Sequence, residues 1–273
     1  MKKEAVFDCH VHLYPDGLSP RVIPMLSERF GNPAAFDGTV AGVKRDMESS
    51  GVNAVLNLPV ATRPDQVESI NQWAEENNSF PVYSLATVHP DTPDLPACLR
   101  DLKKRGFLGI KLHPEYQKFF LDDPRMAPVW STCCDLGLLV MLHAGGERVF
   151  SPPFHTSPKT IAALMDRYPG IRLAAAHMGG FQMWDEVEEV LLGRDIWLDL
   201  SHCLNWCPDE QIVRMVRAHG TDRVMWGTDA PWQKPSEILK RFYDLPFTRE
   251  EQRKILWANT CRMLQITPPI GDD

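Results

Sequence analysis

Eight short apolar runs, each followed by a longer amphipathic segment, constrain this chain more than any other feature of its sequence. Helical patterns such as 63–78, 157–169 and 209–220 separate the runs, which span residues 5–9, 53–60, 81–88, 107–113, 138–144, 171–177, 196–201 and 223–229. Because parallel neighbours need crossover connections, this alternation predicts an α/β fold with a parallel sheet. Eight such units in about 250 residues are typical of a (β/α)8 TIM barrel.

A doubly wound open sheet is the alternative fold, but it usually has fewer units. The first run also lacks the glycine-rich phosphate loop of that fold. We therefore expect residues 1–273 to form a single-domain barrel, with long loops near 13–38 and 145–158 that shape a pocket. Glycines are expected to end helices before the next strand at Gly51, Gly106, Gly137, Gly170 and Gly220.

Charge and composition exclude several classes of partner. The net charge of −7 gives no basic surface for nucleic acid or an anionic membrane. No apolar stretch of about 18 residues is present to span a bilayer, and the N-terminal sequence "MKKEAVFDCH" does not resemble a signal peptide. The seven cysteines lack the dense spacing of a disulfide scaffold. These features predict a cytoplasmic protein that acts on a small molecule.

Ionisable residues gather at the ends of the apolar runs. In "FDCHVHLY", Asp8, His10 and His12 occupy alternate positions and therefore share one face of a strand. Other strand-end residues of this kind are Lys111, His113, His143, His177, Asp199, His202 and Asp229. Strand ends surround one mouth in a barrel, and several ionisable groups buried together need a cation or a substrate. We predict that His10, His12, His143 and Asp229 bind one divalent metal ion, with zinc as the expected metal.

Five motifs in order resemble one known family. "DCHVH", "GIKLHP", "VMLHAGG", "AAAHMGG" and "VMWGTDAPW", followed by "ILWANTCRMLQI", are similar to the amidohydrolase superfamily, in its amidohydrolase-related (amidohydrolase 2) branch, over residues 7 to 266. The resemblance implies a metal at the C-terminal mouth of the barrel, bound by His10, His12, His143 and Asp229. It also implies that Asp229 takes a proton from water, and that His177 either holds a second metal or acts as acid/base.

Lys111 leaves two alternatives open. In binuclear members of the superfamily a lysine at this place is carbamylated and bridges two metals, and "KLHP" resembles that arrangement. An unmodified Lys111 beside His113 would instead bind a substrate carboxylate, which is the interpretation we prefer. Arg148, His155 and His202 are further candidates for contact with substrate, and Asp8 is a candidate to orient a ligand histidine.

The sequence therefore predicts a metal-dependent hydrolase. Metal-bound hydroxide would attack an ester, lactone or amide carbonyl, with Asp229 as base and His177 as acid. The alternative in the same fold is a decarboxylase of a small aromatic or unsaturated acid. A third interpretation is a barrel without catalytic activity, whose metal is structural or absent. Apolar residues on the outer helices are compatible with a homodimer.

Overall fold

The computed structural model describes residues 4–147 and 149–268, which form two compact units. Within the described residues, unit 1 comprises 4–58, 77–83 and 199–268, and unit 2 comprises 59–76, 84–147 and 149–198. Each unit is described by itself. The organisation as one domain remains a prediction from the sequence.

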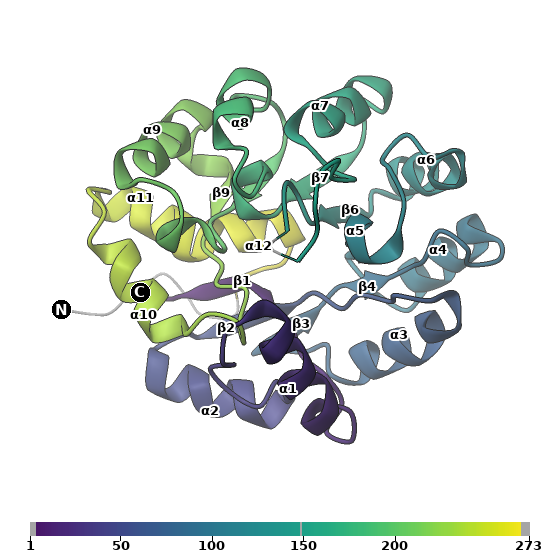
Figure 1. The fold of residues 1–273 in the computed structure, drawn as a ribbon, viewed down its shortest axis with the longest axis horizontal. Helices are drawn as coiled ribbons and strands as arrows, with labels where there is room; N and C mark the ends of the chain where they lie inside the picture. Colours follow the sequence, from purple (N-terminus) through teal and green to yellow (C-terminus); the bar gives the residue numbers. More distant parts are fainter. Residues whose placement is uncertain (1–3, 148, 269–273) are drawn as a thin grey trace. The chain divides into compact units, whose positions relative to one another are not determined.

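Unit 1 contains both ends of the described chain and a small parallel sheet (Figure 1). Its strands are β1 (Phe7–Val11), β2 (Ala54–Asn57), β3 (Val82–Ser84, whose last residue starts the next segment of unit 2) and β9 (Val224–Met225). Its α-helices are α1 (Ser19–Phe30), α2 (Val40–Ser50), α9 (Asp209–His219), α10 (Pro235–Tyr243), α11 (Arg249–Arg253) and α12 (Asn259–Leu264). A π-helical turn, Lys254–Ala258, joins α11 to α12.

Burial and end-capping explain these elements of unit 1. Every residue of β1 is buried, as expected for a strand covered on both faces. Helix α2 begins where Thr39 accepts a hydrogen bond from the backbone N–H of Gly42, and it ends at Gly51 in the left-handed conformation. Helices α2 and α10 pack against each other.

Unit 2 is built from alternating strands and helices, with two α-helices, α5 and α6, between β5 and β6 (Figure 1). Its strands are β4 (Ala86–Thr87), β5 (Gly109–Leu112), β6 (Leu139–Leu142), β7 (Arg172–Ala175) and β8 (Trp197–Asp199, whose last residue begins the final segment of unit 1). Its α-helices are α3 (Val67–Glu76), α4 (Leu95–Lys104), α5 (Pro114–Gln117), α6 (Ala127–Leu136), α7 (Pro158–Arg167) and α8 (Trp184–Val190).

The strands of unit 2 pair in parallel in the order in which they occur along the chain. Gly109 pairs with Leu139, and Leu139 pairs in turn with Arg172, so β5, β6 and β7 are in continuous register. All four residues of β5 and of β6 are buried. Helices pack on their neighbours around these strands, α4 against α6 and α7 against α8. The carboxyl ends of the strands in unit 2 therefore lie along one edge of the sheet.

Strands form at all eight places that the sequence predicts. β1 (Phe7–Val11) begins and ends two residues later than its run, 5–9, and the other strands are shorter than their runs. The run 81–88 divides at Leu85 into β3 and β4. The predicted helices are also confirmed: Ser157 caps α7 by accepting a hydrogen bond from the N–H of Thr160, with Pro158 in the first turn. Gly51, Gly137 and Gly220 directly follow helices as expected.

One local prediction was wrong: the segment 13–38 was expected to be a loop, but it contains helix α1. Gly106 and Gly170 lie between a helix end and the next strand as expected, although α4 is capped by Arg105 and α7 by Tyr168. In the described part of the chain, every helix is too short or too polar to cross a membrane.

Candidate functional site

In unit 1, the end of β1 lies beside the segment 226–230, which follows β9. The N–H of Cys9 donates to the carbonyl of Trp226, and the N–H of Asp229 donates to the carbonyl of His10 at 2.8 Å. Gly227 permits this close approach, because a Cβ at that position would lie 3.0 Å from the Cβ of His10. The pairing brings Asp229 next to the two histidines of "DCHVH", although about 220 residues separate them in sequence.

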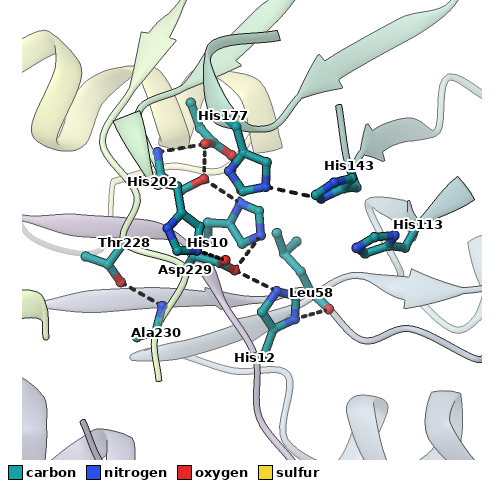
Figure 2. A network of polar contacts seen from close by, with 12 residues as sticks. His10, His12, Leu58, His113, His143, His177, His202, Thr228, Asp229 and Ala230 are labelled. Carbon is teal, nitrogen blue, oxygen red and sulfur yellow. Dashed lines mark hydrogen bonds and ion pairs between the residues drawn. The ribbon is translucent and has the colours of Figure 1, made fainter. Parts of the chain in front are cut away.

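Two imidazoles converge on one carboxylate oxygen. Nε2 of His10 lies 3.2 Å, and Nε2 of His12 lies 2.9 Å, from Oδ1 of Asp229 (Figure 2). The opposite nitrogen of each ring is held by another acceptor: Nδ1 of His12 lies 2.9 Å from the carbonyl oxygen of Leu58. Nδ1 of His10 lies 2.9 Å from Oδ2 of Asp199. Both rings are therefore fixed with Nε2 directed toward Asp229.

His202 fixes the second oxygen of Asp229. Its Nε2 lies 2.7 Å from Oδ2 of Asp229. Both residues have left-handed backbones, with φ of 58° at His202 and 64° at Asp229. For side chains other than glycine this conformation costs free energy, and such strain is concentrated at functional sites. The sequence predicted that His202 contacts substrate, and the structure makes it a partner of Asp229.

The charge of Asp229 is set by its histidine neighbours. Burial would by itself raise the pKa of this carboxyl. The imidazoles of His10 and His202, together with the contact from His12, hold that pKa well below its ordinary range. Asp229 is therefore a carboxylate at neutral pH.

These residues fit a divalent cation. The two Nε2 atoms and Oδ1 of Asp229 meet at one point, which gives two imidazole donors and one carboxylate donor. Oδ1 is buried and accepts no well-directed hydrogen bond from the described residues, despite its two short histidine contacts. Imidazole and carboxylate donors of this kind suit zinc and related divalent ions. The Leu58 carbonyl and the Asp199 carboxylate, which contact the opposite nitrogen of each ring, are partners of the kind that orient metal-binding histidines.

Asp8 has a different role from the predicted one. Instead of meeting a ligand imidazole, its Oδ1 accepts hydrogen bonds from the N–H groups of His10 at 3.1 Å and Thr228 at 2.9 Å. Its Oδ2 accepts from the Thr228 hydroxyl at 2.5 Å. Burial raises the pKa of Asp8 to about 7. Asp8 therefore ties β1 to the segment that carries Asp229, and Asp199 orients His10.

Unit 2 holds a group of histidines at the carboxyl ends of its strands. The rings of His113 and His143 stack, with centroids 3.9 Å apart and planes inclined by 10° (Figure 2). Nε2 of His177 lies 3.2 Å from Nδ1 of His143, and Nε2 of His113 lies 3.8 Å from Oε2 of Glu147. Donor atoms of His113, His143 and Glu147 lie within 4.8 Å of one another, which permits a metal ion.

The geometry of this cluster favours stacking over shared ligation. Lone pairs of two parallel rings lie in parallel planes, so they do not point to a common centre.

The other predicted residues of unit 2 occupy different places. Lys111 is fully buried within β5, and its carbonyl accepts from the Thr87 hydroxyl at 3.2 Å. Arg148 lies outside the described residues.

Some contributors to these groups were not predicted. Asp199 was noted as a strand-end residue without a role, and Ser201, whose Oγ lies 3.1 Å from Nδ1 of His10, was not noted at all. Glu147 was also missed. Each lies near the end of a strand, which was the only signal available, because no motif links it to its partner.

Comparisons with known proteins agree with the motifs. A family model described as Amidohydrolase matches residues 7–266. No curated protein matches the chain. One similar solved structure is an uncharacterised TIM-barrel protein from Bordetella bronchiseptica, 16% identical, covering 96% of this chain and 98% of that chain, with a TM-score of 0.76.

Two other similar structures carry names of enzymes. A 5-carboxyvanillate decarboxylase from Novosphingobium aromaticivorans, complexed with manganese and a nitrobenzoic acid, is 14% identical, covers 96% of both chains and has a TM-score of 0.73. A putative 2-pyrone-4,6-dicarboxylic acid hydrolase from Pseudomonas putida is 15% identical, covers 97% of this chain and 98% of that chain and has a TM-score of 0.67. The predicted α/β class and (β/α)8 fold are confirmed.

Proposed function

Because the chain belongs to the amidohydrolase family, we propose that it is a metal-dependent hydrolase. Its substrate would be a small carboxylate-bearing molecule with an ester, lactone or amide bond. The observation that carries the proposal is the convergence of the His10 and His12 Nε2 atoms on Oδ1 of Asp229, with each ring held from behind. A divalent metal bound there, zinc in our proposal, supplies Lewis-acid polarisation and lowers the pKa of water.

Asp229 has two tasks in this proposal. One oxygen faces the two ligand histidines, and the other is held by His202 at 2.7 Å. This contact fixes the plane of the carboxylate, and the second lone pair of Oδ2 is available to accept a proton from water. His202 therefore supports the base by orienting it.

Five residues between 111 and 177 enter the proposal from the sequence analysis. We propose His143 as a further metal ligand and His177 as the acid that protonates the leaving group. Lys111 and His113 would bind the carboxylate of the substrate, as would Arg148. The Lys111 side chain is fully buried, and an ammonium group in such a place is favoured by an anionic partner. A carbamylated Lys111 with a second metal is the alternative to be tested.

Decarboxylation is the second candidate function. It is supported by the similarity, over 96% of this chain, to a structure named as a manganese complex of 5-carboxyvanillate decarboxylase. The same donor set suits manganese as well as zinc. In this case Asp229, His10 and His12 would hold the metal, and the leaving group would be carbon dioxide.

Metal content and a substrate panel test the proposal together. Elemental mass spectrometry of protein purified without chelator should find about one divalent metal per chain, and about two would indicate the carbamylated Lys111. The panel should contain 2-pyrone-4,6-dicarboxylic acid, simple esters and amides, 5-carboxyvanillate and 2,6-dihydroxybenzoate. Hydrolysis without carbon dioxide release supports the first function, and the reverse selects the second. The metal-dependent proposal fails if His10→Ala leaves both metal content and activity intact.

A further inference from the structure

The β6–α7 loop, residues 143–157 of unit 2, is attached at both of its ends. At its start, the N–H of Gly146 donates to the carbonyl of Phe181 at 2.9 Å, and the N–H of Phe181 donates to the carbonyl of Ala144. At its end, Ser157 caps α7. The described residues between these points, 147 and 149–156, contain neither helix nor strand. Their position therefore depends on side-chain contacts.

Helix α5 provides those contacts. Tyr116 packs edge-to-face against Phe150, with ring centroids 5.3 Å apart. His113, which caps α5, lies beside Glu147 with an Nε2–Oε2 distance of 3.8 Å. Three residues at the start of α5 thus face the loop: the N-cap residue His113 and Tyr116 through these contacts, and Glu115 through a shorter one.

Glu115 makes the strongest of the contacts. One carboxylate oxygen accepts from the backbone N–H of His155 at 2.5 Å, and the other lies 2.6 Å from its Nδ1. The Glu115 side chain is 2% exposed. A buried carboxylate is costly unless it is hydrogen-bonded, so this pair holds His155 in a single arrangement. The His155 ring also stacks on Phe120, with centroids 4.5 Å apart.

Helix α5 is itself anchored. Oε1 of Gln117 accepts from the N–H of His113 at 2.8 Å. Its Nε2 donates to the carbonyls of Ala61 at 2.9 Å and Val88 at 2.6 Å. Gln117 is buried, so these bonds form in a low-dielectric interior where they are strong. Helix α5, to which the loop is attached, is therefore itself held in place.

We propose that Glu115 is a positioning residue whose carboxylate, through His155, holds the β6–α7 loop so that Glu147 stays beside His113. The inference rests on the proposed function, because His113 and this loop matter to catalysis only if they contact substrate. Glu115 itself touches neither substrate nor metal. Its contribution is to reduce the number of loop conformations that binding would otherwise have to restrict.

Hydrogen exchange measured by mass spectrometry on the intact chain tests the proposal without any substrate. Glu115→Ala should accelerate amide exchange of residues 147–156 at least tenfold, whereas β6 and α7 should exchange as in the wild type. Glu115→Gln should lie close to the wild type, because its amide oxygen still accepts from His155 N–H and its Nε2 can donate to a neutral imidazole. Asp166→Asn, which removes an exposed ion pair of unit 2 with Arg194, is the matched control.

Two results would overturn the positioning role. One is loop exchange in Glu115→Ala equal to that of the wild type. The other is acceleration spread evenly over unit 2, which indicates a merely structural residue. If Glu115→Ala does not fold, His155→Phe carries the test, since it keeps the stacking on Phe120 and loses the side-chain pair. Once a substrate is identified, KM should rise at least tenfold in Glu115→Ala, with kcat changed less than threefold. The exchange experiment uses no substrate, so its result stands even if no compound of the substrate panel is turned over.

Discussion

Oδ2 of Asp199 lies 2.9 Å from Nδ1 of His10, although 189 residues separate the two in the sequence. Both side chains are buried. The contact decides which nitrogen of His10 carries the proton and which is directed toward Asp229. Asp199 therefore belongs to the proposed metal centre, because it orients the His10 ring.

Replacing Asp199 with Asn should weaken metal binding by about 10- to 100-fold. Asn keeps the size of the side chain but loses the negative charge that makes His10 a good donor. Competition with a chromogenic chelator measures the affinity. Ser201→Ala is the matched control, because it removes the weaker 3.1 Å contact to the same nitrogen and should cost less. Equal affinities in Asp199→Asn and the wild type would contradict the role of Asp199.

The fold could be predicted well because its strands are buried on both faces and therefore read as apolar runs. Apart from β1, which ends at Val11, the strand ends were placed too late, since residues such as His113 and Asp229 follow their strands and were counted within the runs. Nothing in the sequence of 81–88 signals the break at Leu85. The helix in 13–38 was missed because it includes Pro20 and Pro24, which interrupt the expected pattern.

The proposed metal ligands were easier to predict than the residues that orient them. His10 and His12 are two apart on a strand, and a closed barrel places the last strand beside the first, as the pairing of Val11 with Ala230 shows. Asp199 and Glu115 have partners that depend on three-dimensional packing, so spacing alone could not identify them. The homodimer, the cytoplasmic location and the roles of Lys111 and Arg148 remain predictions.

Metal addition should stabilise the folded chain by mass action. At a free zinc or manganese concentration 100 times the dissociation constant, the free energy of unfolding should increase by about 2.7 kcal/mol. Urea denaturation of chelator-treated protein, with and without the metal, measures the change. His10→Ala and Asp229→Asn should lose the increment, because each removes one of the converging donors.

The control for metal addition is His219→Gln, which removes an imidazole from helix α9 and should keep the full increment. An equal metal-dependent increment in His10→Ala would place the cation elsewhere. The same titration would then be repeated with His113→Asn, to ask whether the group of His113, His143 and Glu147 is the binding site.

Asp8 should make the metal-free protein less stable as the pH rises. Its folded pKa of about 7 lies above the usual value of 3.8, so between these values the unfolded chain releases a proton that the folded chain retains. Stability is therefore lost from about pH 4 to about pH 7, by an amount on the order of 4 kcal/mol. Asp8→Asn should remove this loss, since its amide stays neutral and the Thr228 hydroxyl can turn to accept from it.

Urea denaturation of metal-free wild type and Asp8→Asn at pH 5 and pH 8 measures this difference. Other groups titrate in both proteins and cancel in the comparison. Asp16→Asn, at an exposed carboxylate of unit 1, should follow the wild type at both pH values. Parallel profiles for Asp8→Asn and the wild type would show that Asp8 is already ionised in the fold.

Gly145→Ala should destabilise the chain by about 3 kcal/mol or more, because two costs combine at this position. The backbone is left-handed, with φ of 86°, which disfavours alanine by roughly 1 kcal/mol. An added Cβ would also lie 2.2 Å from the backbone nitrogen of Phe181, which cannot move without breaking its bond to Ala144. Gly137→Ala isolates the first cost, since Gly137 has φ of 61° and no atom within 4 Å of the added Cβ. Denaturant midpoints that fall equally in the two variants would show that the loop start can shift, and that the attachment of the β6–α7 loop at Gly145 is weaker than its geometry implies.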